Sequence, residues 1–435
     1  MKSHFIIKVT RNFEKTFTGN IPYWKDFILM DKSRAVESFF PQFDNLFRSR
    51  NLNFWVTKEY EPQSATWSAE EIFAELNLIY RVILQNDYAP QPELVTQITL
   101  FPNIVNAAII DVVETPIPLQ TVSTTASIES KKNAELIYLQ YAKLMTKGLP
   151  EIKIAVLDTG VNLDHKELKG KFKFAADFVN IQGLDTTGFI GDINDYDDVP
   201  EDEVGHGTHV SGIIAAKGIA MDEGVCPNCS IMPVRVLATM KNGNKLVGAG
   251  IIDNINAGIK WAVDNGADVI NMSLGIKHEG GGLPHEDVIQ YALKKNVTIV
   301  AASGNDGTNE KYYPGALPGV IAVGAVDDSG TVTNFTSYGA DITVVAPGLN
   351  IYSSFSENTY SVASGTSQAS PFVAGTVGLL KSYAKGKGKI LSNDAIKYIL
   401  KHSSDKPDNK QRSQKSGYGL INLADAFKLL NHLLK

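Results

Sequence analysis

Residues 151–430 alternate between short apolar runs and longer amphipathic stretches. Runs rich in β-branched residues are expected as strands, and stretches with apolar residues at helical spacing, such as 250–265 and 288–295, are expected as helices. Fully apolar strands that alternate with helices are typical of a parallel sheet covered on both faces, so the pattern predicts an α/β domain. The expected strands are 152–157, 231–237, 269–274, 298–302 and 320–326.

Residues 1–114 follow a different pattern, which predicts a smaller α+β domain. A helix is expected to begin after Ser68, because Glu71 three positions later completes a capping box. The Pro-, Ser- and Thr-rich segment that follows lacks apolar periodicity. We therefore expect a linker over 115–135 and a larger domain over 136–435. The other elements expected in the N-terminal domain are strands at 5–9, 53–57, 80–84 and 107–113, and helices at 34–50 and 92–100.

Composition excludes some classes of function. The 435 residues carry a net charge of -6, and no basic cluster of the kind that binds nucleic acid is present. No run approaches the roughly twenty apolar residues that span a membrane, and the N-terminus lacks the apolar core of a signal peptide. We expect a cytoplasmic protein, with export by another route left open.

The two cysteines, Cys226 and Cys229, are separated by two residues. A thiolate zinc site needs a second pair of ligands, and no second pair lies nearby. Two interpretations remain: two small residues packed in a turn, or a short local disulfide or redox-sensitive pair.

Ser367 lies in the segment SVASGTSQASP, which precedes an apolar helical run over 372–383. The free N–H groups and positive dipole end of a helix N-terminus stabilise an oxyanion that forms beside such a serine. A serine is also an ordinary helix cap, so this segment alone does not decide the function.

A histidine and an aspartate supply the partners that a serine nucleophile requires. His206, in the segment GHGTHVSG, is a candidate base, because a serine hydroxyl needs a base with a pKa near neutrality. Asp158 ends an apolar strand, so its carboxylate is expected to be buried and to need a partner such as the imidazole N–H. His209 is interpreted as a structural neighbour, because no third metal ligand has suitable spacing.

These segments resemble, in the same chain order, the three signature segments of the subtilisin family. Asp-Thr-Gly follows an apolar strand, His-Gly-Thr-His opens a helix, and Gly-Thr-Ser precedes Ala-Ser-Pro. The order Asp, His, Ser is the known order in subtilisin. The resemblance covers residues 153–425 and implies a subtilisin-like α/β catalytic domain. It also implies a serine endopeptidase that cuts protein or peptide substrates with Asp158, His206 and Ser367 and requires no cofactor.

The resemblance also implies roles for two connecting segments. Asn305, which ends the run AASGN, would donate a hydrogen bond to the oxyanion together with the Ser367 N–H. An extended substrate would add as a strand beside the run VINMSLG. No carboxylate lies at 301–304, so an apolar side chain is expected before the cut bond (the P1 position). The implied substrate-binding residues are Ser273, Leu274, Gly275, Ala301, Ser303 and Gly304.

Two features depart from the family pattern or stay open. Gln368 follows the nucleophile where the family commonly has Met, but backbone donors do not depend on this side chain, so activity is expected to survive. The acidic run over 192–203 is a candidate structural calcium site, because clustered oxygen ligands suit Ca²⁺. The alternative is a solvated charge run, since the spacing matches no ligand loop.

The N-terminal domain resembles the α+β propeptide that precedes many subtilisin-like catalytic domains, most clearly over 80–114. We expect it to act as an intramolecular inhibitor or folding assistant that is cut in the linker. The alternative is a permanent docking domain for a partner or substrate.

Two other functions are weighed against the endopeptidase. A peptide-binding pseudoenzyme would lack a triad or oxyanion residue, whereas all four are present. A serine lipase or esterase would carry Gly-x-Ser-x-Gly with the histidine last in the chain, whereas here Ser367 comes last.

Overall fold

A seven-stranded parallel sheet forms the centre of the molecule. Its strands are Lys153–Asp158 (β7), Ala176–Asp177 (β8), Ser230–Arg235 (β10), Val269–Met272 (β13), Thr298–Ala302 (β14), Ile321–Val326 (β15) and Ile342–Pro347 (β16). Their order is β16-β15-β14-β13-β7-β10-β8, and every neighbouring pair is parallel. The computed structural model describes residues 3–13, 20–86, 92–109, 112–115, 120–122, 128–181, 186–193, 196–243, 245–278, 283–406 and 411–435.

Helices cover both faces of this sheet, as the sequence predicts for strands that are apolar throughout. The helices His206–Ala215 (α7) and Thr366–Gly386 (α10) share one apolar core with the sheet. Ile252–Asp264 (α8) and Glu286–Lys294 (α9) share the core on the opposite face. The predicted α/β domain is therefore confirmed. The remaining helices of this part are Ile128–Leu136 (α5), Leu139–Met145 (α6), Asn393–Ser403 (α11) and Leu423–Leu433 (α12).

The N-terminal region forms an antiparallel sheet in the order β2-β3-β1-β4. Its strands are His4–Val9 (β1), Phe54–Lys58 (β2), Ile79–Leu84 (β3) and Ile104–Ile109 (β4), and its helices are Trp24–Leu29 (α1), Pro41–Ser49 (α2), Ala69–Phe73 (α3) and Pro92–Thr99 (α4). The predicted helix over 34–50 is too long: α2 begins at Pro41, because proline favours the first helical turn and lacks the N–H needed further inside.

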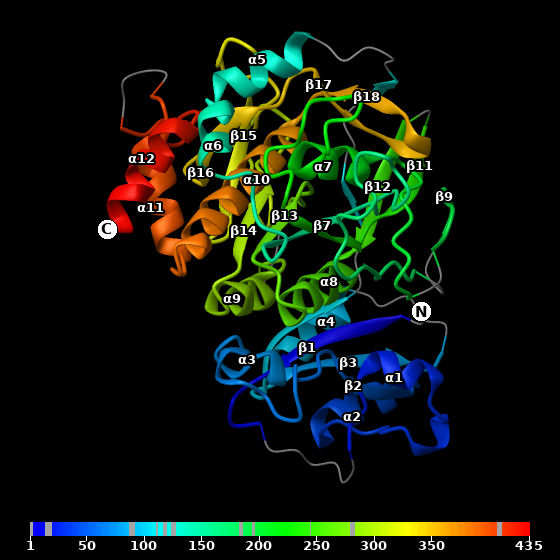
Figure 1. Cartoon of the computed structure of the whole chain (residues 1–435). Helices are drawn as coiled ribbons and strands as arrows, with labels where there is room; N and C mark the ends of the chain where they lie inside the picture. Colours follow the sequence, from blue (N-terminus) through cyan, green and yellow to red (C-terminus); the bar gives the residue numbers. More distant parts are fainter. Residues whose placement is uncertain are drawn as a thin grey trace.

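Charged side chains join the N-terminal sheet to α8 and α9, which lie directly above it in Figure 1. Most of these groups are buried or half-buried, so each depends on its partner for compensation. Three of the bonds that cross this boundary are His4 Nε2 to Asp253 Oδ2 at 2.8 Å, Lys8 Nζ to Asp287 Oδ1 at 2.7 Å and, from α3 next to the sheet, Glu71 Oε1 to Lys260 Nζ at 3.0 Å.

The described residues that follow β4 include two strands, and each of them joins a further sheet. Val112–Thr115 (β5) pairs antiparallel with Lys245–Ile251 (β12), in a sheet that continues through Ala238–Asn242 (β11) to Phe189–Ile190 (β9). Gln120–Val122 (β6) pairs antiparallel with Tyr360–Ala363 (β18), whose other neighbour is Ile351–Ser354 (β17). The strand expected over 107–113 is thus divided between β4 and β5.

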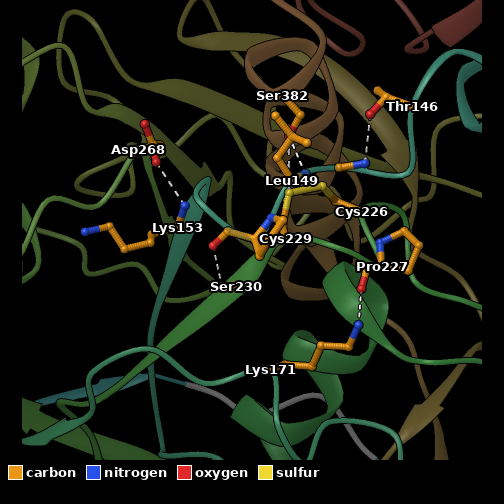
Figure 2. Close-up of a disulfide and its surroundings, with 12 residues drawn as sticks. Thr146, Leu149, Lys153, Lys171, Cys226, Pro227, Cys229, Ser230, Asp268 and Ser382 are labelled. Atoms are coloured by element: carbon orange, nitrogen blue, oxygen red, sulfur yellow. Dashed lines mark hydrogen bonds between the residues drawn. A yellow bond between two sulfur atoms is a disulfide. The ribbon is translucent and has the colours of Figure 1, made fainter. Parts of the chain in front are cut away.

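Cys226 and Cys229 form a disulfide, so the local-disulfide interpretation holds. Both residues are buried in the core between α7 and α10. Figure 2 shows the bridge beside Ser382 of α10, whose hydroxyl lies 3.6 Å from Cys229 Sγ and accepts the Leu149 N–H at 3.1 Å. Glycines make the room for it: a Cβ at Gly148 would lie 2.5 Å from Cys226 Sγ.

We expect the disulfide to add modest stability, because it closes a loop with a sequence separation of only 3. Replacing both cysteines by alanine should lower the free energy of unfolding by about 2 kcal/mol from chain entropy alone. Thermal unfolding of the full chain measures this loss, with wild type in reductant as the control. Alkylation of both thiols in denatured, unreduced protein would contradict the assignment of a bridge.

Candidate active site

Asp158 and His206 form a buried pair at the carboxyl end of the central sheet. Asp158 is the last residue of β7, and its side chain is fully buried. Its Oδ1 lies 2.6 Å from His206 Nδ1 and also accepts the Thr159 N–H at 2.8 Å. The pair places the imidazole with Nδ1 towards the carboxylate and Nε2 on the other side, which is the orientation that a general base needs.

His206 is the first residue of α7, and two glycines allow this placement. Gly205 precedes the helix at a φ of 88°, in the left-handed region that glycine adopts without strain. Gly207 brings the helix close to the end of β7, since a Cβ there would lie 2.0 Å from the Gly160 carbonyl oxygen. The positions before and after His206 therefore both require glycine, the first for its backbone angle and the second for lack of space.

Asp202, which the sequence reasoning missed, ties the two halves of this pair together. Its Oδ1 accepts the Thr159 hydroxyl at 2.8 Å and the Gly205 N–H at 2.8 Å. Its Oδ2 accepts the N–H and hydroxyl of Thr208 at 2.8 and 2.7 Å. The carboxylate thus connects the residue after Asp158 to the first turn of α7. The only local signal is an acidic residue four positions before the histidine.

Nearby carboxylates raise the pKa of His206. Burial opposes the charged imidazolium, but Asp158 and, more weakly, Asp202 hold the pKa of His206 above its ordinary value. His209 differs: burial lowers its pKa to about 3, and its Nε2 lies 3.1 Å from the backbone oxygens of Ile351 and Ser361. These bonds support the interpretation of His209 as a structural neighbour.

Ser367 lies in the first turn of α10 and is almost fully buried, at 3% exposure. Its hydroxyl donates to the Ser273 carbonyl oxygen at 3.1 Å. Within the described part of the chain, His206 Nε2 is buried without a hydrogen-bond partner. The structure therefore shows the Ser367 hydroxyl bonded to Ser273 and not to His206; hydrogen bonds between catalytic groups are often long or poorly aligned in substrate-free sites.

Asn305 follows β14 and is oriented by Thr366. Its Oδ1 accepts the Thr366 N–H at 2.8 Å and the Thr366 hydroxyl at 2.9 Å. Because the amide oxygen takes both bonds, the NH2 group is the half of the side chain left to donate to a ligand. Gln368, the departure from the family pattern, is fully buried, and neither of its amide atoms has a partner among the described residues.

A cavity of about 120 Å³ opens beside Ser367. Of the residues predicted to bind substrate, Leu274, Gly275 and Gly304 line it, whereas Ala301, Ser273 and Ser303 do not. Ser303 and Ser273 turn their hydroxyls to backbone oxygens, of Ser337 at 3.2 Å and of Ser367 at 2.8 Å. The other residues that line the cavity are Ala302, Asn305, Asp306, Tyr312, Thr366 and Ser367.

The described residues do not fit a calcium site in the acidic run over 192–203. No three His, Cys, Asp or Glu side chains converge among the residues that the structure describes, and 194–195 lie outside them. Asp202 is occupied by protein donors, and Glu203 Oε2 lies 3.6 Å from Arg235. No step of the chemistry is therefore assigned to a metal. No helix in the described part of the chain is long and apolar enough to cross a membrane.

Comparison with known proteins agrees with this geometry. The model of the subtilase family, Peptidase_S8, matches residues 150–419. The chain belongs to the subtilase family. It is 38% identical over 259 residues to thermitase of Thermoactinomyces vulgaris, covering 58% of this chain and 81% of that protein. The prediction of a subtilisin-like serine endopeptidase is confirmed at the level of this family.

Two further matches show how much of this chain resembles known proteins. The chain is 39% identical over 294 residues to the thermophilic serine proteinase of Bacillus sp. (strain AK1), covering 66% of this chain but only 65% of that protein. A solved structure, that of the prenylagaramide maturation protease PagA, matches with a TM-score of 0.54 at 30% identity, covering 67% of this chain and 98% of that one.

We expect Asp202 to act on catalysis through the charge of His206 as well as through the fold. Asp202→Asn removes the negative charge that helps to hold the pKa of His206 up. Since the base acts in its neutral form, a lower pKa should move the acid limb of kcat/KM to lower pH. The pH dependence of peptide hydrolysis by the full chain measures this.

The matched control is Asp197→Asn, which removes an exposed carboxylate from the same loop, one that accepts only the Val199 N–H among the described residues. The prediction is wrong if the acid limb of the kcat/KM profile of Asp202→Asn stays at the wild-type pH while the melting temperature falls. Asp202 would then have a purely structural role.

Proposed function

We propose that this subtilase cuts peptide bonds through an acyl-enzyme on Ser367, with His206 as general base and Asp158 as its partner. The observation that carries the proposal is the buried Asp158–His206 bond of 2.6 Å, at the sheet edge where α10 presents Ser367. Asn305, whose amide oxygen is already engaged by Thr366, supplies the side-chain donor for the oxyanion.

In the first half-reaction, Ser367 Oγ attacks the carbonyl carbon of the scissile bond while its proton passes to His206 Nε2. Negative charge develops on the carbonyl oxygen, and the Ser367 N–H and Asn305 Nδ2 donate to it. The C–N bond then breaks, and the imidazolium gives its proton to the departing amine. Asp158 stabilises the imidazolium throughout, which is consistent with the raised pKa of His206.

In the second half-reaction, water takes the place of the amine. His206 Nε2 removes a proton from this water, whose oxygen attacks the acyl carbon, and the imidazolium returns the proton to Ser367 Oγ as the ester bond breaks. The products are a free carboxylate and the regenerated serine hydroxyl.

We further propose that the N-terminal region inhibits the protease of the same chain by occupying substrate-binding strands. Extended substrates bind such sites by adding a strand, through main-chain hydrogen bonds. The register pairs Gly248, Ala249 and Gly250 of β12 with residues of β5. A second pairing joins β6 to β18, which ends at Ala363, just before Ser367.

These two pairings support inhibition over the alternative of a permanent docking domain. The chain passes from β5 to β6 through 116–119, which lie outside the described residues. Both strands that receive this segment belong to the catalytic part of the chain, and we propose that an extended substrate pairs with the same edge of β12 once β5 has left it. The ion pairs of the N-terminal sheet with α8 and α9 hold the region in place.

Substitution of the triad and oxyanion residues tests the chemistry. Ser367→Ala should abolish casein cleavage and labelling by a serine-directed fluorophosphonate. Asn305→Ala should keep the labelling but lower kcat about 10²–10³-fold, the effect known for the equivalent change in subtilisin. Casein cleavage by Ser367→Ala at the wild-type rate would refute the mechanism.

Fluorophosphonate labelling of the intact chain tests the inhibition. Only the full-length band on a denaturing gel is scored, with its N-terminal mass checked. Lys8→Glu should speed labelling several-fold, because it replaces a part-buried ion pair with Asp287 by two like charges. Arg34→Glu, the same charge change at an exposed site of the N-terminal region, should not.

Labelling of the intact wild-type band as fast as the band that has lost its N-terminal region would contradict inhibition. That outcome would favour the docking domain instead.

A further inference from the structure

Tyr312 is the largest side chain on the wall of the cavity beside Ser367. Tyr312 lies in the connection between β14 and β15. The residue after it is hydrogen-bonded to the segment that follows β13. Tyr313 and Ile276 exchange two backbone hydrogen bonds, of 2.9 and 3.0 Å. The backbone on the carboxyl side of Tyr312 is therefore held against the strand segment that carries Leu274 and Gly275.

Two glycines make room for the Tyr312 ring. A Cβ at Gly304 would lie 2.4 Å from Tyr312 Cδ2, and one at Gly275 would lie 3.2 Å from Tyr312 Cβ. Gly304 also has a φ of 104°, which a residue with a side chain rarely adopts. The Tyr312 side chain thus occupies the space that the missing side chains of Gly304 and Gly275 leave free. Tyr312 is 9% exposed.

The Tyr312 hydroxyl, at the end of the ring away from the backbone, is held by a hydrogen bond. It donates to Asp306 Oδ2 at 2.5 Å, and the same oxygen pairs with Lys277 Nζ at 2.6 Å. Bonds from Lys277 and then Tyr312 hold the pKa of Asp306 below its ordinary value, so the carboxylate is charged but already compensated. The wall therefore presents a fixed ring and no unpaired charge.

We propose that Tyr312 sets the specificity of this site, admitting compact aliphatic P1 side chains and excluding aromatic ones. The inference rests on the proposed function and names the substrate class of the same site. The cavity of about 120 Å³ is partly open to solvent, so the side chains on its wall limit what it admits more than its volume does. The fixed Tyr312 ring already takes up space there, which leaves room for a compact aliphatic side chain more readily than for a second ring.

The size of the expected discrimination follows from pocket energetics. One methylene that does or does not fit a hydrophobic pocket changes kcat/KM by about 10–200-fold. A P1 phenylalanine side chain is larger than a P1 leucine side chain by more than one methylene. We therefore expect at least about a tenfold preference for P1 leucine over P1 phenylalanine.

The test measures kcat/KM of the full chain on matched peptide nitroanilides that differ only in P1: alanine, leucine and phenylalanine. The readout is the ratio of P1 phenylalanine to P1 leucine on one sample, which cancels the fraction of sites that the N-terminal region blocks. Tyr312→Ala should raise this ratio by about tenfold or more. Tyr312→Phe, which keeps the ring and loses only the hydroxyl, should leave it within about threefold of wild type.

Two results would overturn the inference: equal use of both substrates by wild type, or an unchanged ratio in Tyr312→Ala. Neither result would contradict the proposed function, because both can be observed only with an active protease. Failure of wild type and of the fluorophosphonate probe to react at all would contradict the proposed function instead. If Tyr312→Ala does not fold, Tyr312→Leu removes the ring while keeping an apolar side chain, and the same ratio decides.

Discussion

Burial of the Asp158 carboxylate is the constraint on which the rest of the site depends. The side chain has no exposed surface, and an ion buried in this way needs a partner of matching geometry. His206 is that partner, and its placement requires α7 to begin against the end of β7. Gly207 permits the approach, and Asp202 bonds the two segments together. The catalytic pair and the packing of this helix are therefore one arrangement.

The parallel sheet brings the other parts of the site to the same edge. Asn305 follows one strand, Asp158 ends another, and the helix that carries Ser367 packs on the face they share. Parallel strands end together, so residues far apart in sequence meet there. Thr366 then links two of these elements, because its backbone and hydroxyl both donate to Asn305. Orientation of the oxyanion donor thus depends on where α10 begins.

The proposed specificity and the proposed inhibition depend on two different parts of the catalytic domain. Leu274 and Gly275 form one wall of the cavity whose size depends on Tyr312, and β12 offers a strand edge that β5 occupies. An inhibitor that binds as a strand uses the main chain and leaves the side-chain pocket to select substrates. In these proposals, the packing of Tyr312 between glycines governs which substrates are selected, and the charged contacts with α8 and α9 govern release of the N-terminal region.

By itself, the sequence predicted five of the seven strands of the central sheet, the helices 250–265 and 288–295 beside it, and the candidate residues Asp158, His206 and Ser367, to which the family resemblance added Asn305. These features follow from local periodicity and short motifs, which do not depend on distant contacts. The helix predicted over 34–50 begins only at Pro41 in the structure, because proline favours the first helical turn. Only the tertiary structure decided the roles of Asp202 and Tyr312, the pairing of β5 and β6, and the Cys226–Cys229 bridge. Each depends on which segments the fold brings into contact, and a linear pattern carries no record of such contacts.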